Sequence, residues 1–454
     1  MPVFRLHSLD MLPIADTPHT ILTARWVVPV LPRDAVLEHH AVVIAHGAIA
    51  DVLPSSTALQ RYPSAQVIDL PDHVLIPGLI NLHTHTAMTL MRGLADDLPL
   101  MTWLRDHIWP VESHIVSADF VRDGALLACA EMLRGGVTCF NDMYFFPEAT
   151  ATAALQAGMR AAIGIIAVEF PSAYASDAAD YLTKGIAVRD SLRDESLLSF
   201  CLAPHAPYTV SDTTFERIAV YAAELDLPVH THLHETQDEI RDSVTRHGIR
   251  PLQRLKNLGL LGPNLIAVHA VHLTPEEITL LAEHGCHVAH CPGSNLKLAS
   301  GLAPIHALMQ AGVNVGLGTD SAASNNRLDM LSELRLAALL GKLGANDASA
   351  LPAPQALEMA TINAARALGL DAKIGSLEIG KRADIAAIDL GAAELAPCYH
   401  PLSHIAYAAG REHVSHVWVD GELRVREGRL TGLDTADICA RAGFWRNKIT
   451  QAQA

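Results

Sequence analysis

Eight short apolar runs, most of them separated by segments with helical features, constrain the fold of this chain more than any other feature. The runs have the lengths and the aliphatic content of buried strands. They are Leu79–Leu82, Val137–Asn141, Arg160–Val168, Leu197–Pro204, Val229–His234, Leu265–Val271, Cys286–His290 and Val313–Thr319. Strands that alternate with helices form parallel sheets, and eight such units over roughly 290 residues favour an α/β fold of the closed (β/α)8 TIM-barrel type over an open sheet.

Two of the intervening segments have recognisable helix ends. Ser117 can cap a helix that runs to Arg134. Thr274 followed by Pro275 is typical of a helix start, and Gly285 follows the expected end of that helix. The alternation of strands and helices therefore rests on end signals as well as on apolar runs.

The two ends of the chain have a different pattern, with short runs rich in Val and Ile and little helical periodicity. The runs are Thr20–Val30, Ala41–Val52, Gln66–Ile76, Ala383–Leu390 and His416–Val425, the last with an Asp-Gly turn. Neither group has enough strands to bury a face by itself. We therefore predict one small β-sandwich domain built from residues 1–76 and 377–454, with the barrel in residues 77–376.

Composition excludes several classes of partner. A formal charge of −16 over 454 residues disfavours binding to nucleic acid or to an anionic membrane. Every apolar stretch is interrupted before it reaches the length of a membrane span. The first residues, MPVFRLHSLDMLPIAD, lack the pattern of a secretory signal, and the seven cysteines are scattered without CxxC pairs. We expect a cytoplasmic protein with reduced thiols.

Histidine and carboxylate side chains gather where the apolar runs end, which is where barrel enzymes carry their reactive residues. A single histidine at such a place is usually a hydrogen-bonded structural residue, but the joint pattern favours a metal site. The residues are His83, His85, His205, His230, His232, His234, Glu235, His269, His272, His290 and Asp320.

These side chains have the donor atoms of a hydrolytic metal centre. His83 and His85, at positions i and i+2, point the same way from the end of a strand. Nitrogen and oxygen donors without thiolate suit zinc, and also iron or manganese. Such an ion lowers the pKa of a bound water from about 16 to about 7. The strand period leaves the choice among His230, His232 and His234 open.

Five motifs in barrel order resemble the amidohydrolase superfamily over nearly the whole chain. They are PGLINLHTH, HLHE, VHAVHL, GLGTDSAASNN and GKRADIAAIDL. More narrowly, the stretch HTHTAMTLMRGLADDLPLMTWLRDHIWPVE is similar to the methylthioadenosine/S-adenosylhomocysteine deaminase group. The resemblance implies one divalent ion, zinc before iron or manganese, with the ligands His83, His85, His232 and Asp320. Strand four ends in LAPHAP, without the lysine that bridges two metals in binuclear members, so a single metal is expected.

The resemblance also implies roles for residues around the ion. Glu235 would be the proton shuttle, His269 would orient the attacking hydroxide, and Asp320 would act as a base as well as a ligand. Glu112 matches the residue that holds the ribose hydroxyls, and His205 matches another substrate contact.

Three candidate positions each have a structural alternative. Glu235 can be a solvated acid at a helix start, stabilised by the helix dipole. Glu112 can lie on the wet face of an amphipathic segment. Trp103 can form a wall for the purine or belong to the core.

Together these roles predict hydrolytic deamination of an adenine nucleoside to its inosine-type product and ammonia. The reaction needs hydroxide at C6, a proton for ring N1 and a proton for the departing amine. The segment after strand three, AVEFPSAYASDAAD, contains no arginine for the carboxylate of S-adenosylhomocysteine, and Arg160 lies at the opposite end of that strand. We therefore expect 5′-methylthioadenosine or adenosine before S-adenosylhomocysteine. A neighbouring subunit could supply an arginine, and the family habit predicts a homo-oligomer.

Two rival functions remain open. The same metal centre serves guanine, 8-oxoguanine and cytosine deaminases and triazine chlorohydrolases, whose substrates have no ribose for Glu112 to hold. A metal-free scaffold protein is the other rival. It predicts missing ligands, whereas every ligand position of this chain is filled.

Overall fold

The computed structural model describes residues 19–453, so the prediction made on residues 1–16 lies outside the described part of the chain. One of its two sheets is the predicted barrel, with eight parallel strands that follow one another in chain order. The strands are β5 (Leu79–Thr84), β6 (Val137–Asp142), β7 (Arg160–Ala167), β8 (Leu198–Pro204), β9 (Val229–Leu233), β10 (Leu265–His269), β11 (His287–His290) and β12 (Asn314–Leu317). Each one lies within the predicted run or extends it by one or two residues.

Side-chain and backbone contacts bring the first and last strands of this sheet together. Asp320 N donates to His83 O over 3.0 Å. The side-chain amide of Asn81 donates to Thr319 Oγ1 over 2.8 Å and accepts from Thr319 N over 2.9 Å. Gly318 permits this approach, because a Cβ atom there would lie 2.8 Å from the backbone nitrogen of His83. The sheet is therefore a nearly closed barrel.

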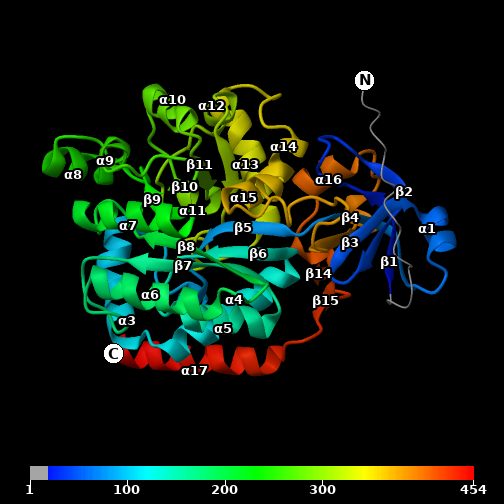
Figure 1. Cartoon of the computed structure of the whole chain (residues 1–454), viewed down its shortest axis with the longest axis horizontal. Coiled ribbons are helices and arrows are strands. Elements are labelled where there is room, and N and C mark those ends of the chain that lie inside the picture. Colours follow the sequence, from blue (N-terminus) through cyan, green and yellow to red (C-terminus); the bar gives the residue numbers. More distant parts are fainter. Residues whose placement is uncertain (1–18, 454) are drawn as a thin grey trace, which may run out of the picture.

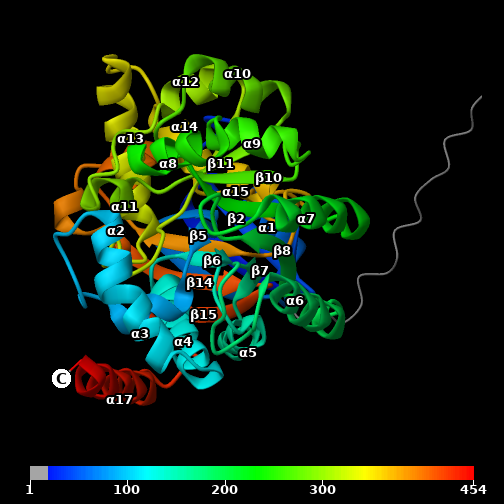
Figure 2. The ribbon, with the colours of Figure 1, turned by 90° about the vertical axis from the view of Figure 1, so that its left-hand side faces the viewer.

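Helices surround the barrel and its ends (Figures 1 and 2). They are α4 (Ala118–Arg134), α5 (Pro147–Ala157), α6 (Ala178–Leu192), α7 (Asp212–Leu225), α8 (Gln237–His247), α9 (Pro251–Asn257), α10 (Pro275–Glu283), α11 (Pro292–Lys297), α12 (Ile305–Gln310), α13 (Met330–Ala345), α14 (Ala353–Met359) and α15 (Ile362–Ala367). Ser117 caps α4 and Thr274 caps α10 with a full capping box, as predicted.

Short helical segments follow β5 over the end of the barrel. They are η1 (Thr86–Met91), α2 (Leu100–Thr102), the π-helical segment η2 (Trp103–Ile108) and α3 (Trp109–Ile115). Outside the barrel lie α1 (Ser55–Arg61), α16 (Pro401–Tyr407) and the turns η3 (Ala393–Leu395) and η4 (Arg411–His413).

The second sheet combines strands from both ends of the chain, as predicted. Its order is β16-β15-β14-β13-β4-β1-β2-β3, and β13 joins the two groups by pairing antiparallel with β4. The strands are β1 (Thr20–Val27), β2 (Leu37–Ala45), β3 (Ala48–Pro54), β4 (Gln66–Pro77), β13 (Ile385–Asp389), β14 (Val414–Val419), β15 (Glu422–Arg426) and β16 (Arg429–Leu430). The division of the chain at 76/77 and 376/377 stays a prediction.

The prediction of one continuous strand at Ala41–Val52 was wrong. The run Ala41–Val52 is not continuous but contains the turn of a hairpin between β2 and β3. His46 and Gly47 form this two-residue turn with φ values of 52° and 72°. Both residues are left-handed, as the tight turns of hairpins require.

The last helix, α17 (Thr435–Gln453), runs along α4 and α3 on the outside of the barrel (Figures 1 and 2). The ring of Trp445 meets Phe120 edge to face at 5.2 Å, and its Nε1 donates to Asp123 Oδ2 over 2.9 Å. The chain thus returns from the terminal sheet to the barrel. Within residues 19–453, no helix has both the length and the apolar character that a membrane crossing needs.

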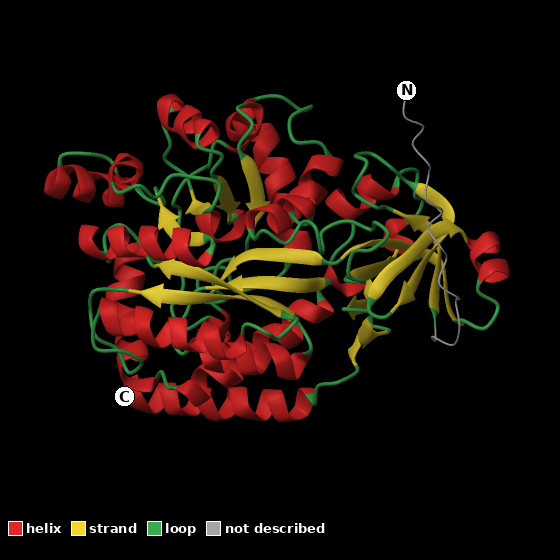
Figure 3. Ribbon diagram, viewed as in Figure 1, coloured by secondary structure: helices red, strands yellow, loops and turns green. Residues whose placement is uncertain are grey.

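Figure 3 shows β7 running with its arrowhead away from the terminal sheet. Because the barrel strands are parallel, their carboxyl ends lie together on that side. Side chains that follow these ends can therefore meet in one place.

Candidate active site

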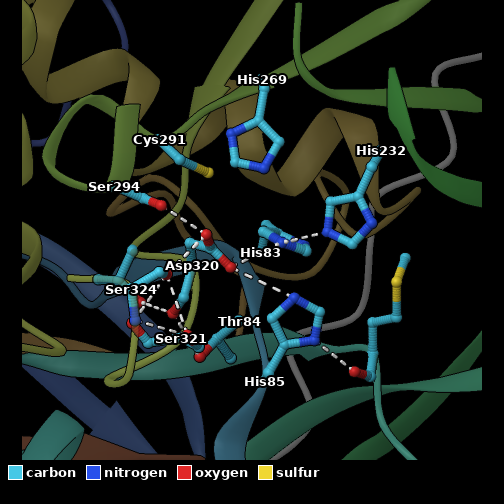
Figure 4. Close-up of polar contacts among 12 residues, drawn as sticks. His83, Thr84, His85, His232, His269, Cys291, Ser294, Asp320, Ser321 and Ser324 are labelled. Carbon is cyan, nitrogen blue, oxygen red and sulfur yellow. Dashed lines mark hydrogen bonds and ion pairs between the residues drawn. The ribbon is translucent and has the colours of Figure 1, made fainter. Parts of the chain in front are cut away.

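The four predicted ligands meet at this end of the barrel (Figure 4). Each of His83, His85, His232 and Asp320 offers one donor atom, and these atoms lie within 4.8 Å of one another. The Nε2 atoms of His83 and His232 are 3.2 Å apart, and Asp320 Oδ1 lies 3.4 Å from His83 Nε2 and 3.2 Å from His85 Nε2. Ligands about 2.1 Å from a tetrahedral zinc ion are about 3.4 Å apart, so the donor set fits such an ion.

Hydrogen bonds on the far side of the rings turn the Nε2 atoms toward this centre. His85 Nδ1 donates to Met143 O over 2.6 Å, and His232 Nδ1 donates to His205 O over 2.7 Å. A carbonyl oxygen accepts only, so each Nε2 keeps its lone pair for a metal. Burial lowers the pKa of His83 to about 3, so this ring is also in the neutral form that binds metals.

Two serine hydroxyls fix the orientation of the Asp320 carboxylate. Its Oδ2 accepts from Ser294 Oγ over 2.6 Å and from Ser324 Oγ over 2.8 Å, which leaves Oδ1 facing the histidines. Burial favours the neutral acid, but the contacts with His83 and His85 outweigh burial and hold the pKa of Asp320 well below its usual range. The residue is therefore the anionic member of the donor set.

His269 and Glu235 lie next to the four donors. The Nδ1 of His269 donates to Asn295 Oδ1 over 2.8 Å, and its Nε2 lies 3.8 Å from Glu235 Oε2. Ser300 Oγ is 3.4 Å from the other oxygen of Glu235. Burial raises the pKa of Glu235 above the ordinary value of a glutamate carboxyl. His269 and Asp320 have φ values of 71° and 59°, which is backbone strain concentrated at the strand ends.

Glu112, His205 and Trp103, predicted to contact the substrate, line the same pocket as three of the four metal donors, His85, His232 and Asp320. The Tyr144 hydroxyl donates to Glu112 Oε1 over 2.8 Å, and within residues 19–453 no hydrogen bond engages Oε2. Burial raises the pKa of Glu112 to about 7 and outweighs the opposing effect of Tyr144. The Nδ1 of His205 is paired with Thr209 Oγ1 at 3.0 Å, and the Trp103 side chain is buried.

A larger outer cavity of about 1400 Å³ adjoins this pocket. Arg105 from η2 and Arg241 and Arg246 from α8 line it. Arg160 does not, because its guanidinium is buried at the start of β7 and donates to Asp384 over 2.9 Å. Arginine side chains therefore reach the cavity from elements other than the segment after β7. The walls common to both spaces are Leu100, Trp109, Glu112, Phe145, Phe170 and Tyr208.

The chain matches a known protein family over the part that forms this site. The model of the amidohydrolase family matches residues 74–424, which include the four donors, Glu112, Glu235 and His269. The chain belongs to the amidohydrolase family. The nearly closed barrel of this amidohydrolase carries the donor set at the carboxyl ends of its strands.

Relatives are similar over almost the full length of the chain. A 5-methylthioadenosine/S-adenosylhomocysteine deaminase of Saccharophagus degradans is 51% identical over 433 residues, covering 95% of this chain and 97% of the relative. The crystal structure of an adenosine deaminase from Xanthomonas campestris with bound zinc has 50% identity and a TM-score of 0.94, covering 95% of this chain and 98% of that one. The zinc complex of an atrazine chlorohydrolase from Arthrobacter aurescens has 26% identity and a TM-score of 0.87, with coverage of 94% and 100%.

The structure also shows which of the three histidines in and directly after β9 belongs to the donor set. His232 joins the donor set of the amidohydrolase, whereas His230 lies behind His83. His234 lies outside the site, because its Nε2 accepts from Leu252 N over 3.0 Å.

Sequence reasoning missed the polar residues that hold the site residues in place. They are Tyr144, Ser294, Asn295, Ser300 and Ser324. All five follow β6, β11 or β12, so they lie at the same end of the barrel as the donors. Their place after a strand end was the available signal, but hydroxyl and amide groups are too common in loops to stand out.

Proposed function

We propose that this amidohydrolase binds one zinc ion at His83, His85, His232 and Asp320 and deaminates an adenine nucleoside. 5′-Methylthioadenosine is the first substrate of the proposal, and adenosine and S-adenosylhomocysteine are the others. The observation that carries the proposal is a buried donor set that opens, through His85, His232 and Asp320, into the pocket that the Glu112–Tyr144 pair lines. The relatives named as nucleoside deaminases support it.

The chemistry follows from the groups around the pocket. When bound, the ion supplies a water nucleophile of lowered pKa near neutral pH. Glu235, whose pKa is raised by burial, donates a proton to ring N1 as the new bond forms at C6. Asp320 Oδ1 takes up one proton of the attacking water and passes it to the departing amine, and the remaining hydroxyl proton returns to Glu235 as the C6–N bond breaks and the C6 carbonyl forms. His269, with Nδ1 fixed by Asn295, orients the water through Nε2.

Glu112 is the proposed contact of the ribose. Its Oε1 is occupied by the Tyr144 hydroxyl, and its Oε2 can accept hydrogen bonds from the 2′- and 3′-hydroxyls. A sugar held at Glu112 would direct its 5′ substituent toward the outer cavity, whose wall Glu112 shares. Arg105, Arg241 and Arg246 on that wall support the inclusion of S-adenosylhomocysteine among the substrates, although the segment after β7 has no arginine.

Triazine hydrolysis is the second candidate function. The atrazine chlorohydrolase from Arthrobacter aurescens has the same fold at 26% identity and was crystallised with zinc. Its substrate has no ribose, so the Glu112–Tyr144 pair favours the nucleoside.

The test is the release of ammonia from a panel of adenosine, 5′-methylthioadenosine, S-adenosylhomocysteine, guanine and cytosine, with chloride release from atrazine measured in parallel. We expect kcat/KM to be highest for an adenine nucleoside. Turnover of guanine, cytosine or atrazine above that of every nucleoside would overturn the proposal.

Two further parts of the proposal are tested separately. Elemental analysis of the purified protein should find zinc rather than iron or manganese at one ion per chain. Light scattering tests the proposed homo-oligomer.

A further inference from the structure

One of the three metal-binding rings is held differently from the others. The Nδ1 atoms of His85 and His232 each face a backbone carbonyl oxygen. The Nδ1 of His83 instead faces Nε2 of His230 at 2.8 Å. A carbonyl oxygen can only accept a hydrogen bond, whereas an imidazole nitrogen accepts or donates according to the tautomer of its ring. The orientation of His83 therefore depends on a second side chain.

We infer that His230 is a positioning residue that holds His83 in its metal-binding tautomer; the inference rests on the metal centre of the proposed function. To present a lone pair at Nε2, His83 must have its proton on Nδ1. That proton is donated to His230 Nε2, so His230 has its own proton on Nδ1. The reverse arrangement, with a proton on His230 Nε2, would move the His83 proton to Nε2 and block the ligand atom.

The position of His230 on β9 explains how this contact arises. His230 and His232 are two residues apart on one strand, so both side chains point into the barrel. His232 reaches the donor set, and His230, one step deeper, reaches the back of the His83 ring. The two rings of His83 and His230 meet edge to face, with centroids 4.8 Å apart.

His230 is not a further ligand. Its Nε2 faces Nδ1 of His83, which is on the opposite side of that ring from the donor set, and the group of potential ligands does not include it. It lies behind a ligand, as the residues do that orient metal-bound histidines.

The surroundings of His230 argue against a purely structural role. The side chain is completely buried, and its Nδ1 has no hydrogen-bond partner within residues 19–453. A buried polar atom without a partner costs free energy that an aliphatic side chain would avoid. An aliphatic residue would therefore suit the barrel interior better, and the contact with His83 is what the imidazole adds.

Two substitutions of similar polarity test this inference. The Oε1 of His230→Gln lies close to the place of His Nε2 and can accept from His83, whereas His230→Asn is too short to reach. We expect the Gln variant to bind cobalt(II) or zinc within about 3-fold of the wild-type affinity. We expect His230→Asn and His230→Leu to bind about 10–100-fold more weakly. Affinity is measured by competition with a chromophoric chelator, so the readout does not depend on substrate turnover.

The absorption spectrum of the cobalt(II) protein gives a second readout. We expect it to be unchanged in His230→Gln and altered in the Asn and Leu variants at saturating metal. The control is His413→Leu, which removes a buried imidazole far along the chain, beside Glu394, and should leave both affinity and spectrum unchanged. Circular dichroism of each metal-free variant establishes that it is folded.

Two results would overturn the inference. One is a folded His230→Asn protein with the affinity and spectrum of the wild type. The other is a folded His230→Gln protein that binds metal as weakly as His230→Asn. Neither result would affect the proposed function, because that is tested by ammonia release from nucleosides with the wild-type enzyme.

Discussion

Glu112 is the side chain that separates nucleosides from free bases in this account. Glu112→Gln should lower kcat/KM for 5′-methylthioadenosine by about 10–100-fold, because an amide has one acceptor oxygen where Tyr144 and the ribose need two, and a buried group left unpaired costs about 1–3 kcal/mol. Steady-state ammonia release measures the effect. Glu148→Gln, at the start of α5 and outside both pockets, should match the wild type. Unchanged nucleoside kinetics in Glu112→Gln would remove the reason for placing a ribose there.

Glu333 on α13 should make stability depend on pH. Its buried carboxyl accepts from Gly293 N and from Asn325 Nδ2, both over 2.8 Å, and burial raises its pKa to about 8. This pKa lies above the unfolded value of about 4.3, so the stabilisation is complete below that value and is lost as pH rises through about 8.

Denaturant titrations between pH 5 and 8 check this expectation. The free energy of unfolding of the wild type should fall with pH more steeply than that of Glu333→Gln, by up to about 1.4 kcal/mol per pH unit. Equal pH dependences of the two proteins would show that Glu333 does not titrate as its burial implies.

At the residue scale, the metal donors were predictable and the residues that hold them were not. His83, His85 and Asp320 follow apolar runs, and it is the gathering of several imidazoles and carboxylates at such run ends, rather than any one of them, that indicates a metal site. Ser294 and Asn295 contact their partners only because α11 brings them against β10 and β12, and no spacing in the sequence records that contact.

The short helix α11 connects two functional strands at the element scale. Ser294 donates to Asp320, and the next residue, Asn295, accepts from His269. Asn295→Ala leaves the buried Nδ1 proton of His269 without a partner, at a cost of about 1–3 kcal/mol. We expect kcat/KM to fall about 10–100-fold, mainly through kcat.

The matched control for this variant is Asn363→Ala. Asn363 is also buried, but its side-chain amide bonds Val315 O on β12, below the site. The control should lose stability and keep its kcat. An Asn295→Ala enzyme with the wild-type kcat would show that His269 needs no such support.

The last helix, α17, should contribute stability without taking part in the chemistry. Trp445→Ala removes the edge-to-face contact with Phe120 and the hydrogen bond to Asp123, and should lower the free energy of unfolding by about 3–5 kcal/mol. Thermal denaturation measures the loss. We expect kcat of the folded variant to stay at the wild-type value, and a loss of kcat without a loss of stability would contradict this role.

Strand boundaries were predictable where apolar runs were bounded by clear turn residues, and they failed in one hairpin. The Asp420-Gly421 turn between β14 and β15 has a sequence that is typical of two-residue hairpin turns. The His46-Gly47 turn does not, because the pairs that mark such turns in a sequence are Asn-Gly, Asp-Gly and Gly-Gly. The apolar pattern on both sides of His46 therefore looked like one continuous strand.

At the scale of the whole molecule, the order of motifs along the chain was informative. Each motif of the site follows a different strand of one parallel barrel, so the order in the sequence becomes an order around the barrel. The composite terminal sheet was also predictable, because the sequence shows only three strand-like runs at one end of the chain and two at the other, although the structure takes four strands from each end. The place of α17 was not, since its contacts with α4 join segments more than 300 residues apart.

In the proposed function, one ion at His83, His85, His232 and Asp320 supports deamination of an adenine nucleoside. The most direct test strips the protein with a chelator and titrates zinc back while ammonia release from 5′-methylthioadenosine is recorded. We predict that activity is lost on stripping and rises linearly to a break at one zinc per chain, and that His232→Ala shows no such rise. Full activity in the metal-free protein, or the same titration curve for His232→Ala, would contradict the account.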